Sequence, residues 1–220
     1  MILEILNILL WAVAIVIILS GLDDLFIDIS YWWFKKKYSR ELPTLKEIND
    51  AKEKPIALII GCWMEYDVIG RTVNLALKNL KYKNYRIFVA VYQNDDKTIA
   101  EVRKYSDNDP RVIMAINPKN GPTSKADNLN NAYRCIKSYE EQYGDFGVIL
   151  IHDSEDFIHP LSMKLYNYLI IHKGYDAVQI PVVPIKSEVG RLFHRTYCDA
   201  FAEVHTKDVK IGRASCRERV

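Results

Sequence analysis

The chain has 220 residues, of which 49% are hydrophobic, and this length and apolar fraction suit one folded domain with a short appendage and exclude disorder for most of it. Its formal net charge is +2, and residues 211–220 carry three arginines and one glutamate, so those ten residues account for the whole charge. Translated back into nucleotides, these ten residues resemble a sequencing adapter, and we therefore set them aside as non-native. The near-neutral remainder excludes a nucleic-acid partner recognised by bulk charge.

The amino-terminal residues 1–22 are expected to form a transmembrane anchor. Residues 5–22 contain no charged side chain, and only Asn7 and Ser20 are notably polar. A run of this length is close to what a bilayer requires at 1.5 Å rise per residue. The alternative is a cleaved signal peptide, but no basic region precedes the apolar run and no small-x-small site follows it. The sequence therefore favours an anchor.

Residues 23–54 are expected to connect the anchor to the soluble domain. Three aspartates interrupt the apolar residues between 22 and 29, so this stretch is predicted either to lie along the interface as a short amphipathic helix or to extend the anchor helix. The polar run 39–54 is predicted to be a linker. An aromatic belt at 31–34 precedes three lysines at 35–37, which places the following domain on the cytoplasmic side.

Strands and helices are predicted to alternate along the soluble domain, residues 55–210. Short apolar runs predict strands at 56–60, 87–91, 112–116, 148–151 and 177–180. Helical spacing of apolar residues predicts helices at 68–80, 99–105, 126–139 and 161–171. This alternation indicates crossover connections and an α/β, Rossmann-like fold with a mainly parallel sheet. The first strand is followed by no glycine-rich phosphate loop, which argues against a dinucleotide enzyme or a P-loop NTPase.

Polar residues follow the predicted strands at the ends where parallel sheets bind their ligands. Glu65 follows the first strand, Asp95 the second, Lys125 the third, and Asp153 with Glu155 the fourth. Because the carboxyl ends of parallel strands meet at one edge, we expect these side chains to gather there. An edge this rich in acids is suited to a cation.

The segment Asp153-Ser154-Glu155 supplies two carboxylates separated by one residue, a spacing that lets both face one Mg²⁺ or Mn²⁺ ion. The simpler alternative is that Glu155 or Asp156 caps the next helix. His152 and His159 are alternative metal ligands of a hydrolase, but no third His or Cys stands at ligand spacing. Position at a strand end favours the cation site.

Lys125 ends a Pro/Gly-containing loop, residues 117–125, that leads into a predicted helix. Such a loop can direct backbone amides and a lysine charge toward a phosphate. The alternative is an ordinary capped helix start with a solvated lysine. The cysteines outside the tail, Cys62, Cys135 and Cys198, are odd in number and scattered, so they indicate thiols in a reducing compartment.

The ordered combination of Asp95, the segment 125–130 (KADNLN) and the segment 153–156 (DSED) resembles family 2 glycosyltransferases with a GT-A fold. It is most similar to the bacterial membrane-bound, phage-adsorption-protein-B-like group, and it is also similar to the cellulose synthase type. The resemblance implies that Glu65 and Asp95 contact the base and ribose of a nucleotide-sugar. It also implies that Lys125 and Asn128 contact the phosphates, and that Asp153 and Glu155 hold the metal and diphosphate. The chain departs from the family in having Glu155 where a second Asp is usual.

Members of this family invert the anomeric centre and need a carboxylate base, which the resemblance implies to lie beyond Lys210, so the catalytic base stays unknown. We therefore expect a truncated domain that is inactive alone. The stretch 199–208 is expected to form an amphipathic helix, with an acceptor-side role as the alternative.

The sequence thus predicts an inner-membrane glycosyltransferase that uses a nucleotide-sugar, with UDP favoured, and a glycan acceptor to build a surface or exported polysaccharide. A polysaccharide-export or outer-membrane partner is a further expectation. One alternative is a membrane-anchored scaffold or receptor component that keeps the fold without turnover. Another is a sugar nucleotidyltransferase, which residues 61–65 disfavour because they lack a glycine- and basic-rich signature.

Overall fold

The computed structural model describes residues 2–40, 43–180, 182, 184 and 196–198, with the backbone alone described for 35–40. The chain divides into two compact units, Met1–Leu42 with Gln179–Val220, and Pro43–Val178. The acidic stretch 199–208, the tail 211–220 and any base beyond Lys210 lie outside the described residues.

One long helix, α1, runs from Ile2 to Arg40. Its segment Ile2–Phe34 is long and apolar enough to cross a membrane, and its most apolar window is not buried against other residues. The helix continues without a break through the aspartates between 23 and 28, which agrees with an extension of the anchor helix rather than a separate amphipathic one. The structure thus has an amino-terminal helix that is a candidate membrane span.

The soluble unit begins with a short helix, α2, at Leu45–Asp50, inside the segment predicted to be linker. The linker prediction is wrong for these residues because Thr44 and Glu47 form a reciprocal capping box. The Glu47 backbone N–H donates to the Thr44 hydroxyl at 3.3 Å, and the Thr44 backbone N–H donates to the Glu47 carboxylate at 2.8 Å. Two helix-end donors are satisfied locally, so a six-residue polar segment can form a helix.

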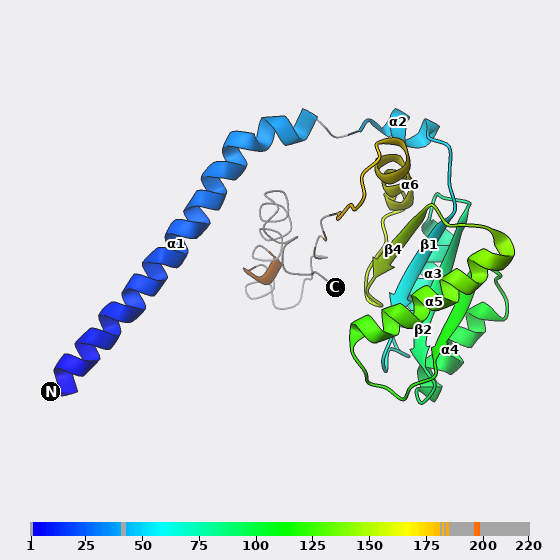
Figure 1. Ribbon diagram of the computed structural model, residues 1–220, viewed down its shortest axis with the longest axis horizontal. Coiled ribbons are helices and arrows are strands. Elements are labelled where there is room, and N and C mark those ends of the chain that lie inside the picture. Colours follow the sequence, from blue (N-terminus) through cyan, green and yellow to red (C-terminus); the bar gives the residue numbers. More distant parts are fainter. Residues whose placement is uncertain (1, 41–42, 181, 183, 185–195, 199–220) are drawn as a thin grey trace. The chain divides into compact units, whose positions relative to one another are not determined.

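Four parallel strands form the sheet in the order β3-β2-β1-β4 (Figure 1). They are β1 (Ile56–Gly61), β2 (Tyr85–Tyr92), β3 (Val112–Asn117) and β4 (Val148–His152). The first four predicted strands are therefore confirmed. In β1, the five residues from Ile56 to Ile60 are all buried, as expected for a strand covered on both faces.

The prediction of a fifth strand at residues 177–180 is wrong. These residues form no strand, and most of their side chains are exposed or half-buried. They follow Gly174, whose positive φ of 75° ends the preceding helical turn. Apolar composition alone does not make a strand, because a strand also needs a neighbouring strand with which to bond.

Helices cover both faces of the sheet (Figure 1). The helix α5 (Lys125–Tyr143) packs on one face, where Ala132 and Ile136 join a core with Ala57, Ile59 and Phe88. The helices α3 (Ile69–Asn79) and α4 (Asp96–Ser106) pack together on the other side. The predicted helix at 161–171 consists of α6 (Ser162–Asn167) and a π-helical turn, η1 (Tyr168–His172).

The strand order has one topological switch point, which lies between β1 and β4. The connections through α3 and α4 add β2 and then β3 on one side of β1, whereas the connection through α5 returns the chain to the other side. Connections that leave in opposite directions open a crevice at the carboxyl ends of the two strands that flank the switch point, and ligands of open α/β sheets bind there.

Candidate functional site

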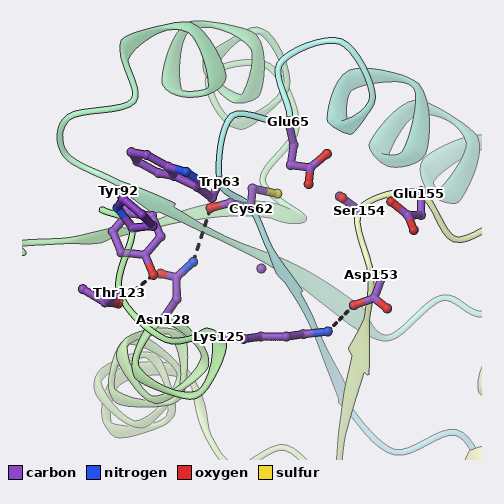
Figure 2. Close-up of a pocket in the computed structure, with 12 residues that line it drawn as sticks. Cys62, Trp63, Glu65, Tyr92, Thr123, Lys125, Asn128, Asp153, Ser154 and Glu155 are labelled. Atoms are coloured by element: carbon purple, nitrogen blue, oxygen red, sulfur yellow. Dashed lines mark hydrogen bonds and ion pairs between the residues drawn. The ribbon is translucent and has the colours of Figure 1, made fainter. Parts of the chain in front are cut away.

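A pocket of about 350 Å³ opens at the carboxyl ends of β1 and β4, at the switch point (Figure 2). Its walls come from the turn after β1, the end of β2, the loop and first turn of α5, and the turn after β4. The residues that line it are Gly61, Cys62, Trp63, Glu65, Tyr92, Pro122, Thr123, Lys125, Asn128, Asp153, Ser154 and Glu155.

Five of the six residues predicted from the sequence line this pocket. Three of them are the carboxylates Glu65, Asp153 and Glu155, and Lys125 is the one basic residue among the described residues of the lining. The pocket is therefore acidic overall. The sixth predicted residue, Asp95, is not part of the lining.

The turn after β4 holds its two exposed acids in place through a third acid, Asp156. The Asp156 carboxylate accepts from the backbone N–H of Asp153 at 3.2 Å and lies 3.4 Å from Nδ1 of His152. The contact with His152 lowers the pKa of Asp156, and the backbone bond from Asp153 adds to the effect. Asp156 thus stays ionised and closes the turn, while Asp153 and Glu155 remain exposed.

The helix-cap alternative for this turn is wrong. The next helix, α6, begins at Ser162 with Leu161 at its N-cap, five residues or more beyond the acids. The hydrolase alternative gains no support either: Nδ1 of His159 accepts from the backbone N–H of Leu161 at 3.2 Å. Within the part of the chain that the structure describes, no three His, Cys, Asp or Glu side chains gather into a set that would hold a metal by themselves.

A second contact fixes the acidic turn from the helix α3. Thr72, in α3, is 7% exposed, and its hydroxyl donates to the backbone carbonyl of Ser154, the residue between the two acids. Ser154 itself is 4% exposed. The acidic turn is thus tied to α3, and Thr72 acts as a positioning residue that the sequence analysis did not identify.

Lys125 is the first residue of α5, and its Nζ donates to Oδ1 of Asp153 across the pocket (Figure 2). Ser124 caps the helix by accepting from the backbone N–H of Asp127 at 3.1 Å. The capped-helix alternative is thus correct for the backbone. The lysine is solvated as well, with 62% of its side chain exposed, but it also pairs with a pocket carboxylate 28 positions away.

The loop before α5 is tied to its neighbours by side-chain hydrogen bonds. Asn94 binds the backbone of Gly121 twice: its Oδ1 accepts from the N–H at 2.7 Å and its amide donates to the carbonyl at 3.0 Å. Asp127 accepts from Lys119 at 2.6 Å and from the Thr123 hydroxyl at 2.9 Å. These contacts fix the direction in which the loop delivers Lys125 to the pocket.

An aromatic wall closes the pocket beside this loop. Trp63 and Tyr92 meet edge to face with ring centroids 5.3 Å apart, and the Tyr92 hydroxyl lies 2.7 Å from the Thr123 hydroxyl (Figure 2). Gly121 packs so closely that an added Cβ would lie 2.5 Å from the Trp63 ring and 2.7 Å from the Tyr92 ring. Only glycine fits here without displacing the wall.

Asp95 has a structural position. It is 6% exposed, and one carboxylate oxygen caps α4 by accepting from the Thr98 N–H at 3.3 Å. The other oxygen accepts from the N–H of Met64 at 2.6 Å, and Met64 has a positive φ of 59°. Asp95 therefore stabilises an unfavourable backbone conformation in the turn that presents Trp63 and Glu65. Its contact with a nucleotide stays a prediction.

Asn128 lines the pocket, but its amide group binds protein. The Nδ2 group donates to the backbone carbonyls of Ala90 at 3.1 Å and Cys62 at 3.4 Å, which ties α5 to the ends of β2 and β1. Its Oδ1 is buried and has no hydrogen-bond partner among the described residues. The predicted contact between Asn128 and phosphate would require the amide to leave these carbonyls, because a carbonyl oxygen does not donate.

Cys62 contributes a thiol to the lining of the pocket. It is 2% exposed, and burial raises the pKa of its thiol well above the ordinary value, with Glu65 and Asp95 adding to the shift. A thiol in this state is not a nucleophile at neutral pH. The pocket is therefore not suited to covalent chemistry at sulfur.

Comparison with known proteins agrees with this arrangement. The family model described as "Glycosyltransferase like family 2" matches residues 54–214. The chain is 40% identical over 208 residues to "Bacteriophage adsorption protein B" of Escherichia coli strain K12 and, equally, to "Bacteriophage N4 adsorption protein B" of Escherichia coli O157:H7. Each alignment covers 91% of this chain and 28% of the relative, so the chain spans little more than a quarter of the length of these proteins.

Proposed function

This chain belongs to the glycosyltransferase-like family 2, and on that premise we propose that it binds a nucleotide-diphosphate sugar, with UDP favoured, for transfer of the sugar to a glycan or other acceptor. The observation that carries the proposal is the pocket at the switch point, where Lys125 of α5 faces the acids that follow β4. In this arrangement a cationic side chain for phosphate stands beside carboxylates for a cation.

The donor set supports Mg²⁺ or Mn²⁺ as the cofactor. Asp153 and Glu155 are exposed carboxylates on one fixed turn, and hard cations of this kind prefer oxygen ligands. Among the described residues, no set of three or more His, Cys, Asp or Glu side chains could hold a metal ion. Two carboxylate ligands suit an ion that keeps water and phosphate oxygens as its other ligands. When bound, such an ion neutralises the charge that develops on the leaving diphosphate.

The aromatic wall supports a nucleobase subsite. Trp63 is half-buried beside the pocket, where a planar base can stack against or abut an aromatic surface. We assign Glu65, on the same turn, to the base or ribose, while Asp95 would act by holding that turn. We assign Lys125 to a phosphate, because it begins a helix whose amide groups also favour negative charge.

We propose inversion at the anomeric carbon, with a carboxylate base outside the described residues. The chain's own residues would bind and orient the donor, and the base would remove the acceptor proton as the new glycosidic bond forms. The apolar helix α1 supports a membrane anchor, and we propose the bacterial inner membrane with the pocket on the cytoplasmic side.

The relatives are named for bacteriophage adsorption, and a transferase that builds a surface or exported polysaccharide is compatible with that name. A polysaccharide-export or outer-membrane partner belongs to the same proposal. The name equally favours a second function, a membrane-anchored scaffold or receptor component without turnover. Assays of sugar transfer and donor hydrolysis, with this chain and with its longer relatives, separate the two, because a scaffold would bind at most and release no nucleotide.

Calorimetric titration of the detergent-solubilised chain with UDP-sugars and Mn²⁺ tests the donor site. We expect binding that Asp153→Ala abolishes. Asp145→Ala serves as the matched control, since Asp145 is an exposed acid at the opposite end of β4. Equal binding by the wild type and Asp153→Ala would remove Asp153 from this role, and no binding by the wild type to any nucleotide-sugar would refute the proposal.

A further inference from the structure

We infer that Lys125 makes cation binding depend on the diphosphate: its ion pair with Asp153 resists a divalent cation that arrives alone and releases when a diphosphate gives the lysine another partner. This inference rests on the proposed function, and it concerns how that same pocket is loaded.

The ion pair occupies one oxygen of a carboxylate that is proposed to hold the cation. Nζ of Lys125 donates to Oδ1 of Asp153, the acid that begins the turn after β4. Glu155 lies on the same turn and Glu65 also lines the pocket, so an approaching cation meets more than one carboxylate (Figure 2). Among the described residues of the lining, Lys125 alone opposes it by charge.

The competition has a definite size. A divalent cation on Asp153 would lie near the lysine ammonium, and repulsion between the two at about 5 Å in water-like surroundings corresponds to roughly a tenfold loss of affinity. The cation must also displace the ammonium from Oδ1, which adds a small factor because exposed ion pairs are weak. A diphosphate removes both obstacles, because its oxygens bind the ammonium and the metal together.

The pair is built to exchange partners. The side chains of Lys125 and Asp153 are 62% and 54% exposed, so water and ligand can reach both ends of the contact. The backbones on either side are fixed, by the Ser124 cap of α5 and by Asp156 within the turn. Loading the pocket would therefore move side chains and leave the walls in place.

A second lysine in the same loop shows a different arrangement. Lys119 pairs with Asp127 at 2.6 Å, and neither residue is part of the pocket lining. That contact stabilises the loop, and its carboxylate, Asp127, lies outside the pocket in which the cation is proposed to bind. The coupling is therefore a property of Lys125 alone among the described loop lysines.

Mn²⁺ binding followed by electron paramagnetic resonance tests the inference on the full chain in detergent micelles. The titrations use Mn²⁺ alone and Mn²⁺ with saturating UDP, for the wild type, Lys125→Gln, Lys125→Arg and Lys137→Gln. Lys137 is the matched control because it lies on the same helix in an ion pair with Glu140 and is 55% exposed. Circular dichroism establishes that each variant is folded.

We expect Lys125→Gln to bind Mn²⁺ alone roughly tenfold more tightly than the wild type, by the Coulomb estimate above. The factor by which UDP strengthens Mn²⁺ binding should fall by a similar amount, and reciprocity requires the same fall in the effect of Mn²⁺ on UDP. Lys125→Arg and Lys137→Gln should resemble the wild type. Unchanged or weaker Mn²⁺ binding by Lys125→Gln, with normal binding of Mn²⁺ and UDP together by the wild type, would overturn the inference alone. Failure of the wild type to bind Mn²⁺ with UDP would overturn the proposed function and this inference with it.

Discussion

Replacing Asp95 by asparagine separates a structural role from a role in nucleotide binding. The carboxylate accepts two backbone N–H groups, from Met64 at 2.6 Å and from Thr98 at 3.3 Å, and the side chain is 6% exposed. Asparagine has one acceptor oxygen, so one of these buried N–H groups must face an NH₂ group. We expect the variant to fold with a weakened turn after β1 and a weakened start of α4.

The expected loss can be estimated from these contacts. A buried N–H without an acceptor costs about 1–3 kcal/mol, and loss of a negative charge at a helix start costs about 0.3–1 kcal/mol. We therefore expect the free energy of unfolding of Asp95→Asn to fall by roughly 2–3 kcal/mol. Urea unfolding in detergent, followed by tryptophan fluorescence, measures it because Trp63 lies in the affected turn.

Asp96→Asn is the matched control, because Asp96 is the adjacent acid and is exposed. Because Asp96 is also an acid in the first turn of α4, its replacement should lower the free energy of unfolding by no more than about 1 kcal/mol, the charge contribution alone. The structural reasoning is refuted if Asp95→Asn is as stable as the control. If such a stable variant also binds UDP more weakly, Asp95 contacts the nucleotide, as the family resemblance implies.

Three further changes test the walls of the pocket and the pH dependence of the fold. Gly121→Ala places a methyl group against Trp63 and should cost about 1–3 kcal/mol and weaken UDP binding; unaltered affinity would contradict the close packing. Thr72→Val removes the donor to the acidic turn and should cost about 1 kcal/mol and weaken Mn²⁺ binding, whereas Thr72→Ser should retain both; equal effects of the two would exclude the hydroxyl as the cause. The Arg111 guanidinium holds the pKa of Asp109 below its ordinary value, so this stabilisation is present above the unfolded pKa near about 3.9 and is lost as pH falls through the folded pKa. Asp109→Asn should cost about 1 kcal/mol at neutral pH and flatten the fall in stability between about pH 5 and pH 2; a pH profile parallel to that of the wild type would refute this assignment.

The four strands were predictable because burial on both faces leaves a direct mark on the sequence. β1 and β2 are nearly continuous apolar runs, and their buried fractions agree with that pattern. The run 177–180 has similar composition, but whether it forms a strand depends on a partner that local sequence does not specify. The short helix α2 was missed because two polar residues, Thr44 and Glu47, stabilise it rather than an apolar face.

The site was predictable to the level of the sheet edge but not to the level of atoms. Parallel strands bring every residue after them to one edge, so Glu65, Asp95 and Asp153 were expected together. Which of them faces the pocket depends on partners far away in sequence, such as Met64 for Asp95, at a separation of 31 positions. A local signal did exist, since Asp95 stands three residues before Thr98, the spacing of a helix N-cap.

The contrast between Asp95 and Asp153 also shows how two similar acids come to occupy different structural positions. Both follow a strand at the same edge, but Asp95 is buried and each of its oxygens accepts from a backbone N–H, so its carboxylate is held in place by the protein itself. Asp153 is exposed, its turn is held by Asp156 rather than by its own carboxylate, and its partner is a flexible lysine that a phosphate can take over. Asp95 thus stabilises the turn after β1, whereas Asp153 is available for exchange between partners.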